Sequence, residues 1–308
     1  MMKVFVTGIA GQLGHDCIFE LEKRGHRAIG SDVSFANVQL PERTGSLGYE
    51  TPDPDFVKLD ITDREEVLNV IRRIRPDAVI HCAAWTAVDA AEDEENREKV
   101  DRINHLGTQY IAEAAKTVDA KMVYISTDYV FDGQGEMPWQ PDDKNYAPLN
   151  VYGKSKLDGE LAVSSVLEKY FIVRIAWVFG KNGSNFVKTM LKLAENHDEL
   201  RVVNDQIGTP TYTEDLARLL VDMIETDRYG YYHATNEGGY ISWYDFACEI
   251  FRQAGLEDKM HVVSVSTAEY GLSKAARPFN SRLDKSKLAE NGFKPLPDWR
   301  DALRRYLG

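Results

Sequence analysis

The sequence predicts an α/β fold in which a doubly wound parallel sheet is followed by a smaller C-terminal α/β lobe. Three observations lead to this prediction. Short apolar runs alternate with longer amphipathic segments along the first part of the chain. These runs are continuously apolar, which is typical of strands buried on both faces. Strands that alternate with helices pair in parallel through right-handed crossovers, which gives a Rossmann-like arrangement.

The expected elements follow in chain order. Six strands are predicted at 3–8, 26–32, 56–60, 77–84, 121–127 and 171–177. The helices predicted between them include 64–74 and 105–116, where apolar residues recur at helical spacing. After about residue 178 the alternation fades into helices separated by short strands and Pro/Gly turns, so a second lobe is expected from there. Residues 35–55 carry three prolines and little periodicity, and they predict a long loop between the second and third strands.

Composition narrows the class of protein. With 308 residues, of which 43% are hydrophobic, the chain can form one large domain with an appendage or two domains. Its formal net charge of -12 lacks the basic excess that attracts nucleic acid or an anionic membrane surface, so neither partner is expected. An anionic ligand would therefore need local positive charge from a few Arg or Lys residues and from helix N-termini.

The cysteines and the N-terminal sequence indicate the compartment. Cys17, Cys82 and Cys248 are scattered and form no CxxC pair, which favours neither a disulfide framework nor a zinc site. A reducing cytoplasm fits this pattern. The chain enters its first strand pattern without a signal peptide, and no later run has the ~18 apolar residues that a membrane span needs. A soluble, cytoplasmic protein is expected.

Glycines follow the first predicted strand. Gly8, Gly11 and Gly14 have GxxGxxG spacing and open the first helix, where backbone N–H groups and the positive end of the helix dipole can bind a pyrophosphate. Asp32 ends the second strand, where a carboxylate can accept hydrogen bonds from an adenosine ribose. The alternative is that the glycines only form a tight turn, but the strand, helix and acid around them favour dinucleotide binding. Asp60 can contact an adenine, or it can cap a helix.

A second motif lies in "NVYGKSKLDGE", residues 150–160. Tyr152 and Lys156 are four apart on a predicted helix and therefore share one face. An adjacent ammonium would lower the tyrosine pKa from its ordinary value of ~10, and the same lysine can bond a nicotinamide ribose. Thr127 follows the fifth strand at the sheet edge that also carries the glycine turn, so it can bond a carbonyl oxygen beside the tyrosine hydroxyl. The alternative for Thr127 is an ordinary turn residue.

These residues resemble the extended short-chain dehydrogenase/reductase superfamily, and within it the dTDP-4-dehydrorhamnose reductase family. Eight blocks occur in the family's order between residues 8 and 284: "GIAGQLGHD", "AAWTAVDAAE", "STDYVFDG", "PLNVYGKSKLDGE", "RIAWVFG", "NFVKTML", "VVNDQIGTPTY" and "NSRLD". The resemblance implies reduction of the C4 ketone of dTDP-4-dehydro-L-rhamnose to dTDP-L-rhamnose, with NADPH or NADH as the cofactor. It also implies a dinucleotide-binding domain at 1–177, which receives parts of 209–235, and a mainly substrate-binding lobe at 178–308.

The resemblance assigns roles to individual residues. Tyr152 would protonate the alkoxide, Lys156 would tune Tyr152 and hold the ribose, and Thr127 would adjust the proton donor. The residues implied to bind the cofactor are Gly8, Gly11, Gln12, Leu13, Gly14, Asp32, Asp60, Ile61, Ala84, Trp85, Thr86, Tyr152 and Lys156. Those implied to bind the dTDP-sugar substrate are Thr127, Asp128, Asn104, Trp177 and Arg282, with Lys188 as a weaker candidate for its diphosphate.

Each of these substrate residues has an ordinary alternative. Trp177 can be core packing, Asn104 can lie on a helix surface, and Arg282 and Lys188 can be surface charges. Bidentate Arg suits a diphosphate better than Lys does, which favours Arg282 of the two.

Some features depart from the family or stay open. The loop at 35–55 is longer than expected and lies next to Asp32, and Arg43 within it could accommodate a 2'-phosphate, so the choice between NADH and NADPH is open. Some family members bind magnesium at a dimer interface through acidic residues. Here the position early in the first helix is Asp16, a shorter acid, and no metal is predicted. A homodimer is compatible with the resemblance.

Two other functions remain as alternatives. The first is another sugar-nucleotide reductase or epimerase of the superfamily. The second is a non-catalytic relative such as the regulatory beta subunit of methionine adenosyltransferase. The intact set of Thr127, Tyr152 and Lys156 favours an enzyme, because a regulatory role places no chemical demand on it.

Overall fold

The computed structural model describes residues 1–34 and 56–308. Its centre is a seven-stranded sheet in the order β11-β6-β5-β4-β1-β2-β3, and all neighbouring strands pair in parallel. The strands are β1 (Lys3–Thr7), β2 (Arg27–Asp32), β3 (Phe56–Lys58), β4 (Ala78–His81), β5 (Lys121–Thr127), β6 (Tyr170–Ile175) and β11 (Gly230–His233). The predicted α/β, doubly wound parallel sheet is therefore confirmed.

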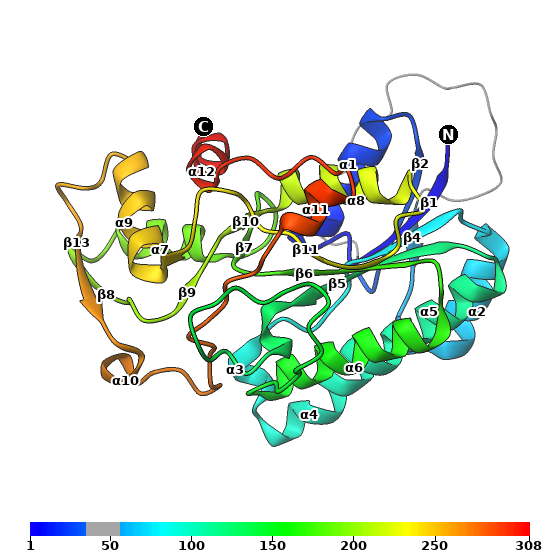
Figure 1. Cartoon of the computed structure of the whole chain (residues 1–308), viewed down its shortest axis with the longest axis horizontal. Coiled ribbons are helices and arrows are strands. Elements are labelled where there is room, and N and C mark those ends of the chain that lie inside the picture. Colours follow the sequence, from blue (N-terminus) through cyan, green and yellow to red (C-terminus); the bar gives the residue numbers. More distant parts are fainter. Residues whose placement is uncertain (35–55) are drawn as a thin grey trace.

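Helices cover both faces of this sheet (Figure 1). On one face α1 (Gln12–Lys23) packs against α8 (Thr213–Ile224). On the other face lie α2 (Arg64–Ile74), α5 (Thr108–Thr117) and α6 (Val151–Val166). Each layer encloses its own apolar core, with Val4, Val6 and Leu220 in one and Phe5, Ile71 and Val79 in the other. Alternate residues of β1 thus face opposite cores, as a two-sided buried strand requires.

The second half of the chain contributes to the large sheet and also builds a smaller lobe at one end (Figure 1). β11 extends the large sheet beside β6, so residues after 209 belong partly to it. The lobe contains α7 (Phe186–Leu193), α9 (Trp243–Gln253), α10 (Thr267–Tyr270) and α12 (Trp299–Leu307). Three strand pairs accompany them: β8 (Glu199–Val203) with β13 (His261–Val265), β7 (Val178–Phe179) with β10 (Thr211–Tyr212), and β9 (Ile207–Gly208) with β12 (Ile241–Ser242). Another short helix, α11 (Ser286–Glu290), precedes α12.

Local signals explain where several helices begin. The Asp63 side chain accepts a hydrogen bond from Glu66 N–H at the start of α2, and Glu65 and Glu66 favour the positive end of its dipole. The Asn150 side chain accepts one from Gly153 N–H at the start of α6. Ser242 and Asp245 form a capping box at the start of α9.

The helix predicted at 105–116 differs from the observed element. After α3 (Val88–Ala91) and α4 (Glu94–Asp101), residues Arg102–Gly107 form a π-helical turn that leads into α5. A π turn inserts an extra residue into the helix, so the side chains on either side of it rotate relative to an unbroken helix. Helical periodicity in the sequence cannot show this insertion. The predicted loop at 35–55, with Arg43, lies outside the described residues, and no helix in the described ranges meets the length and hydropathy of a membrane span.

Candidate active site

A cleft of about 1430 Å³ opens at the carboxyl ends of β1, β2, β4, β5 and β6. Ligands of open parallel sheets bind at this edge, and the strand order reverses between β1 and β4. The predicted site residues that line the cleft are Gly8, Gly11, Gln12, Leu13, Gly14, Asp32, Asp60, Ile61, Ala84, Thr86, Thr127, Asp128, Tyr152, Lys156 and Trp177. Within the described ranges, Trp85, Asn104 and Arg282 do not line it. Segments far apart in the sequence therefore meet in one cavity.

The glycine turn brings α1 close to the neighbouring loop. Gly8 has a φ of 73°, and a Cβ built on it would lie 2.6 Å from Ala83 N. A Cβ on Gly14 would lie 2.3 Å from Gly8 O, so this position also requires glycine. Helix α1 begins after Gly11, and in the described structure its start has neither a side-chain cap nor an acidic residue in the first turn. Its N–H groups therefore face the cleft and fit an anionic pyrophosphate.

Asp32 fixes the glycine turn from the end of β2. Its Oδ2 accepts a hydrogen bond from Ala10 N–H at 3.0 Å, and its Oδ1 accepts one from Val33 N–H at 2.8 Å. Each carboxylate oxygen has a second lone pair, so Asp32 can still accept hydrogen bonds from ribose hydroxyls in the cleft.

Asp60 lies at the far side of this part of the cleft. Its Oδ1 accepts hydrogen bonds from Thr62 N–H at 2.9 Å and from Thr62 Oγ1 at 2.8 Å. The alternative role of helix cap is wrong for Asp60, because Asp63 caps α2.

Thr127, Tyr152 and Lys156 all reach the inner part of the cleft and are all buried or half-buried. Thr127 Oγ1 donates to Asp128 Oδ1 at 2.9 Å and accepts a hydrogen bond from Tyr129 N–H at 3.2 Å. Burial raises the pKa of Tyr152 above its ordinary value, the Asp128 charge raises it further, and the nearby Thr127 side chain opposes both effects. Tyr152 is therefore held as a neutral phenol that can donate a proton.

The lysine differs from the prediction in one respect. Lys156 Nζ lies 4.2 Å from the centre of the Tyr124 ring, and burial lowers its pKa to about 7, while the Glu160 and Cys82 charges act in the opposite sense. The expected lowering of the Tyr152 pKa by Lys156 is not observed, because burial and the Asp128 charge dominate at that phenol.

Asp128 is a buried carboxyl in the same part of the cleft. Burial raises its pKa to about 6, while the nearby Ser281 and Thr127 side chains act in the opposite sense. The neighbouring Ser126 also lines the cleft, and its buried Oγ has no hydrogen-bond partner within the described residues. An orphaned buried hydroxyl at this place fits a ligand that supplies the missing partner.

Asn104 lies behind the cleft wall, so the prediction of direct substrate contact needs correction. Its side chain is fully buried, which also excludes the helix-surface alternative. Asn104 Oδ1 accepts from Trp85 N–H at 2.8 Å, and its Nδ2 donates to Trp85 O at 3.1 Å and to Ser155 Oγ at 2.9 Å. The π turn thus directs Asn104 inward, where it ties the loop at 84–86 to α6. Trp85 contributes backbone to this link, while its indole N–H bonds Ala87 O.

Trp177 forms an aromatic wall at the other end of the cleft. It has a φ of 52°, which is unusual for a bulky residue, and its ring stacks on Trp243 with centroids 3.9 Å apart. A Cβ on Gly208 would lie 3.0 Å from the Trp177 ring, so a small residue is needed there. Trp177 also packs on two apolar clusters, so its core-packing role and its place in the cleft coexist. Trp243 lines the cleft as well, and its sequence position gave no signal of this.

The expected local positive charge comes from other residues than those predicted. Arg282 Nη1 donates to Asn280 Oδ1 at 3.1 Å, outside the cleft lining, and Lys188 Nζ donates to the carbonyl oxygens of Lys181 and Gly183. Both are occupied by local contacts. Within the described ranges, the cations that line the cleft besides Lys156 are Lys99 of α4 and Arg102 of the π turn. In the sequence, only their spacing of three along a helical segment indicates that Lys99 and Arg102 share one face.

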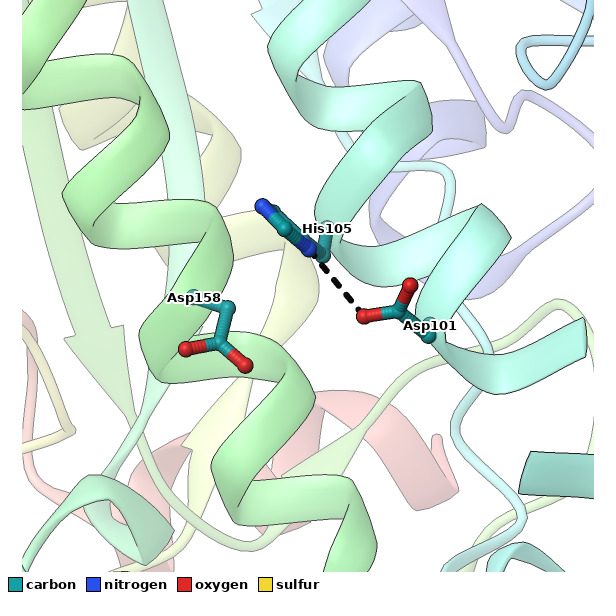
Figure 2. Close-up of side chains that lie close together, drawn as sticks. All are labelled: Asp101, His105 and Asp158. Carbon is teal, nitrogen blue, oxygen red and sulfur yellow. Dashed lines mark hydrogen bonds and ion pairs between the residues drawn. The ribbon is translucent and has the colours of Figure 1, made fainter. Parts of the chain in front are cut away.

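A cluster of possible metal ligands lies away from the cleft. Asp101, His105 and Asp158 offer ligand atoms within 4.8 Å of one another, and Figure 2 shows Asp158 of α6 opposite the pair formed by His105 and Asp101. His105 Nδ1 is 3.0 Å from Asp101 Oδ1, and Asp158 pairs with Lys154 at 2.5 Å. Each carboxylate thus already has a partner four residues away in the chain, which gives ordinary surface contacts.

Asp16, the acid early in the first helix, is also engaged in hydrogen bonds. Its Oδ1 bonds His15 Nδ1 at 3.1 Å, and its Oδ2 accepts a hydrogen bond from Thr213 Oγ1 at 2.5 Å. The second bond links α1 to α8, so Asp16 has a role in packing the two helices.

Comparison with known proteins places the chain among similar sequences and structures. A family model described as RmlD substrate binding domain matches residues 2–308. The spore coat polysaccharide biosynthesis protein SpsK of Bacillus subtilis (strain 168) is 40% identical over 307 residues, which cover 100% of this chain and 97% of SpsK. The dTDP-4-dehydrorhamnose reductase of Aggregatibacter actinomycetemcomitans is 39% identical over 315 residues, covering 99% of this chain and 98% of the relative. The crystal structure of dTDP-4-dehydrorhamnose reductase from Bacillus anthracis str. Ames in complex with NADP matches with a TM-score of 0.86 at 40% identity, covering 99% of this chain and 98% of that chain.

Proposed function

Because the chain belongs to the RmlD substrate binding domain family, we propose that it reduces the C4 ketone of dTDP-4-dehydro-L-rhamnose to dTDP-L-rhamnose with NADPH or NADH. The observation that supports this most strongly is the convergence of Thr127, Tyr152 and Lys156 in the cleft that also contains the glycine turn. A ketone reductase needs a proton donor and a dinucleotide-binding site at the same edge of the sheet.

The nicotinamide cofactor supplies the hydride that adds to C4 of the sugar. The start of α1 and the turn at Gly8 and Gly11 hold the cofactor's diphosphate, and Asp32 accepts hydrogen bonds from its adenosine ribose. At the other end of the cleft, Lys156 holds the nicotinamide ribose. Because its pKa is about 7, the Lys156 ammonium can lose its proton near neutral pH in the buried site, and it can donate hydrogen bonds to the ribose hydroxyls.

Tyr152 donates its proton to the oxygen on C4. Its raised pKa keeps it protonated at neutral pH, and Thr127, which lines the same cleft, orients the hydroxyl. Asp128 and Trp177 line the same part of the cleft and contact the sugar in this proposal. The phenolate left on Tyr152 is then reprotonated from solvent.

The two alternatives have less support. An epimerase must oxidise and then reduce its substrate, so it would retain NAD tightly through purification, whereas a reductase exchanges its cofactor with solution. A regulatory relative would bind a partner protein without needing Thr127, Tyr152 and Lys156 together. The curated relatives that cover this chain almost completely include a dTDP-4-dehydrorhamnose reductase, which favours the reductase.

Oxidation of NADPH and of NADH with enzymatically generated dTDP-4-dehydro-L-rhamnose tests the proposal. We expect turnover with at least one cofactor and dTDP-L-rhamnose as the product, identified by its proton NMR spectrum. Absence of turnover with both cofactors, in protein that binds NADPH, would overturn the assigned substrate. The homodimer compatible with the family resemblance is a separate proposal, and sedimentation velocity tests it.

A further inference from the structure

A segment from the second half of the chain packs against elements that carry cleft residues. We name residues 273–280, "SKAARPFN", the strap. The strap bonds to three separate segments that carry cleft residues: the start of α3, the turn after β5, and the start of α6. One short segment is thus tied to each stretch of chain that supplies the reactive groups.

Asp89 anchors the strap. It lies in α3, beside Val88 of the cleft lining. Asp89 Oδ1 accepts hydrogen bonds from the backbone N–H groups of Lys274 at 3.1 Å and Ala275 at 3.0 Å. Its Oδ2 accepts one from Arg277 Nη2 at 2.6 Å. A single carboxylate therefore fixes both the backbone and the guanidinium of the strap.

Arg277 extends this contact to the aromatic residues of the cleft. Its Nη1 donates to the Tyr129 hydroxyl at 3.3 Å. The Tyr129 ring meets the Tyr152 ring edge-on, with centroids 5.7 Å apart and an interplanar angle of 80°. Tyr129 also lines the cleft, and a Cβ built on Gly153 would lie 2.4 Å from Tyr129 O. The turn that carries Tyr129 is therefore packed directly on the helix that carries Tyr152.

The start of α6 is tied to the same strap. Asn150 Oδ1 accepts from Gly153 N–H at 2.7 Å and so caps the helix, while Asn150 Nδ2 donates to Ala276 O at 2.8 Å. Tyr152 lies in the first turn of this helix. The orientation of that turn therefore depends on contacts with the strap as well as on the sheet.

We propose that Asp89 and Arg277 form a latch that positions Tyr152 for proton donation. They are positioning residues, because they act on Tyr152 through Tyr129 and do not line the cleft themselves. This inference rests on the proposed reduction. It assigns the latch a role in the geometry of the proton donor, where small displacements have large effects on rate.

The latch residues are partly exposed, so their ion pair is expected to position Tyr152 and not to hold the fold together. Asp89 and Arg277 are partly exposed, with side-chain exposures of 46% and 26%. Ion pairs of this kind add little to stability. Removing the latch is therefore expected to leave the protein folded and to change the position of Tyr152.

The test compares Arg277→Met with the unchanged protein and with Lys274→Ala. Lys274 Nζ pairs with Asp93 on the exposed side of the strap, so its variant removes a side-chain contact of the strap and keeps the backbone N–H that bonds Asp89. For Arg277→Met we expect kcat to fall on the order of 10- to 100-fold, as a misplaced donor predicts. We also expect a larger solvent deuterium isotope effect on kcat, because proton transfer becomes slower. Affinity for NADPH should be unchanged, and Lys274→Ala should behave like the unchanged protein.

Two further variants sharpen the test. Arg277→Lys can reach only one of the two partners at a time, so partial rescue is expected. Tyr129→Phe removes only the hydroxyl that Arg277 contacts and should lower kcat in the same direction. Because Asp89→Asn acts through the same contact, its combination with Tyr129→Phe should be clearly less damaging than the product of the two single effects.

The outcomes distinguish the latch from the proposed function. If the unchanged protein binds NADPH but does not reduce the ketosugar, the proposed function fails. Crystal structures of the unchanged protein and Arg277→Met still test the latch in that case: a displaced Tyr152 hydroxyl supports it, and coincident positions overturn it. If the unchanged protein is active, equal kcat and isotope effects in Arg277→Met overturn the latch. A higher KM at unchanged kcat overturns it as well, since that result indicates a substrate contact.

Discussion

Replacing Tyr152 with phenylalanine removes the proposed proton donor and little else. The ring and its edge-on contact with Tyr129, at 5.7 Å, are kept. Thr127 Oγ1 retains a partner, because it donates to Asp128 Oδ1 at 2.9 Å. No buried polar group is therefore left unpaired by the change, and the free energy of unfolding should change by about 1 kcal/mol or less.

The effect on turnover should be much larger. General acid catalysis by a positioned side chain contributes about 10²- to 10⁴-fold, so Tyr152→Phe should lower kcat by a factor in that range. The glycine turn and Asp32 are distant from the phenol in sequence and bind the other end of the cofactor, so NADPH affinity should stay within about twofold. Steady-state turnover with dTDP-4-dehydro-L-rhamnose and titration of NADPH fluorescence measure the two quantities separately.

Tyr270→Phe provides a matched control, because Tyr270 ends α10 and does not line the cleft. Its turnover should equal that of the unchanged protein. Undiminished turnover in Tyr152→Phe would refute the role of the phenol. A parallel loss of NADPH binding would show that the variant had altered the cleft as a whole and not the proton transfer alone.

Two further predictions concern stability. Glu160 and Arg174 form a fully buried bidentate ion pair at 2.8 Å. Glu160→Gln leaves the Arg174 charge buried without its partner and should lower the free energy of unfolding by about 3–5 kcal/mol in urea denaturation. The double variant Glu160→Leu/Arg174→Met should recover most of this loss, and an equally unstable double variant would contradict the prediction. His81 is buried between Thr7 and Thr108, and burial lowers its pKa to about 3. Between pH ~6.5 and about 3, His81 is therefore protonated in the unfolded chain but neutral in the folded protein. The free energy of unfolding should fall as pH falls through this window, by about 1.4 kcal/mol per pH unit relative to His81→Asn. Parallel stability curves for the two proteins would contradict that assignment.

Sequence patterns were sufficient for most of the large sheet. Continuous apolar runs placed its first six strands, because strands buried on both faces leave no polar alternation. The π turn at Arg102–Gly107 was not predictable, since helical periodicity looks the same on either side of one inserted residue. β11 joins the sheet from far along the chain, and the prediction that parts of 209–235 belong to this domain comes from the family resemblance, because local sequence does not encode long-range strand pairing.

Site residues could be predicted where the motif that contains them lies within a single turn or helix. The glycine turn and the Tyr152–Lys156 pair depend on one turn and one helix, and both line the cleft. Residues that depend on distant partners were missed or misplaced. Trp243 reaches the cleft by stacking on Trp177, and Arg277 of the strap contacts the Tyr129 hydroxyl. Arg282 is different, because a local hydrogen bond to Asn280 holds its guanidinium outside the cleft lining.

The transfer of a labelled hydride tests the central claim most directly. NADPH carrying deuterium at the transferable position of its nicotinamide ring is incubated with the protein and dTDP-4-dehydro-L-rhamnose, and the product is analysed by NMR. A ketone reduced in this cleft should give dTDP-L-rhamnose with deuterium on C4 and a loss of that proton signal. Deuterium that stays on the cofactor while the sugar is converted, or appears at another carbon, would contradict hydride delivery beside Tyr152.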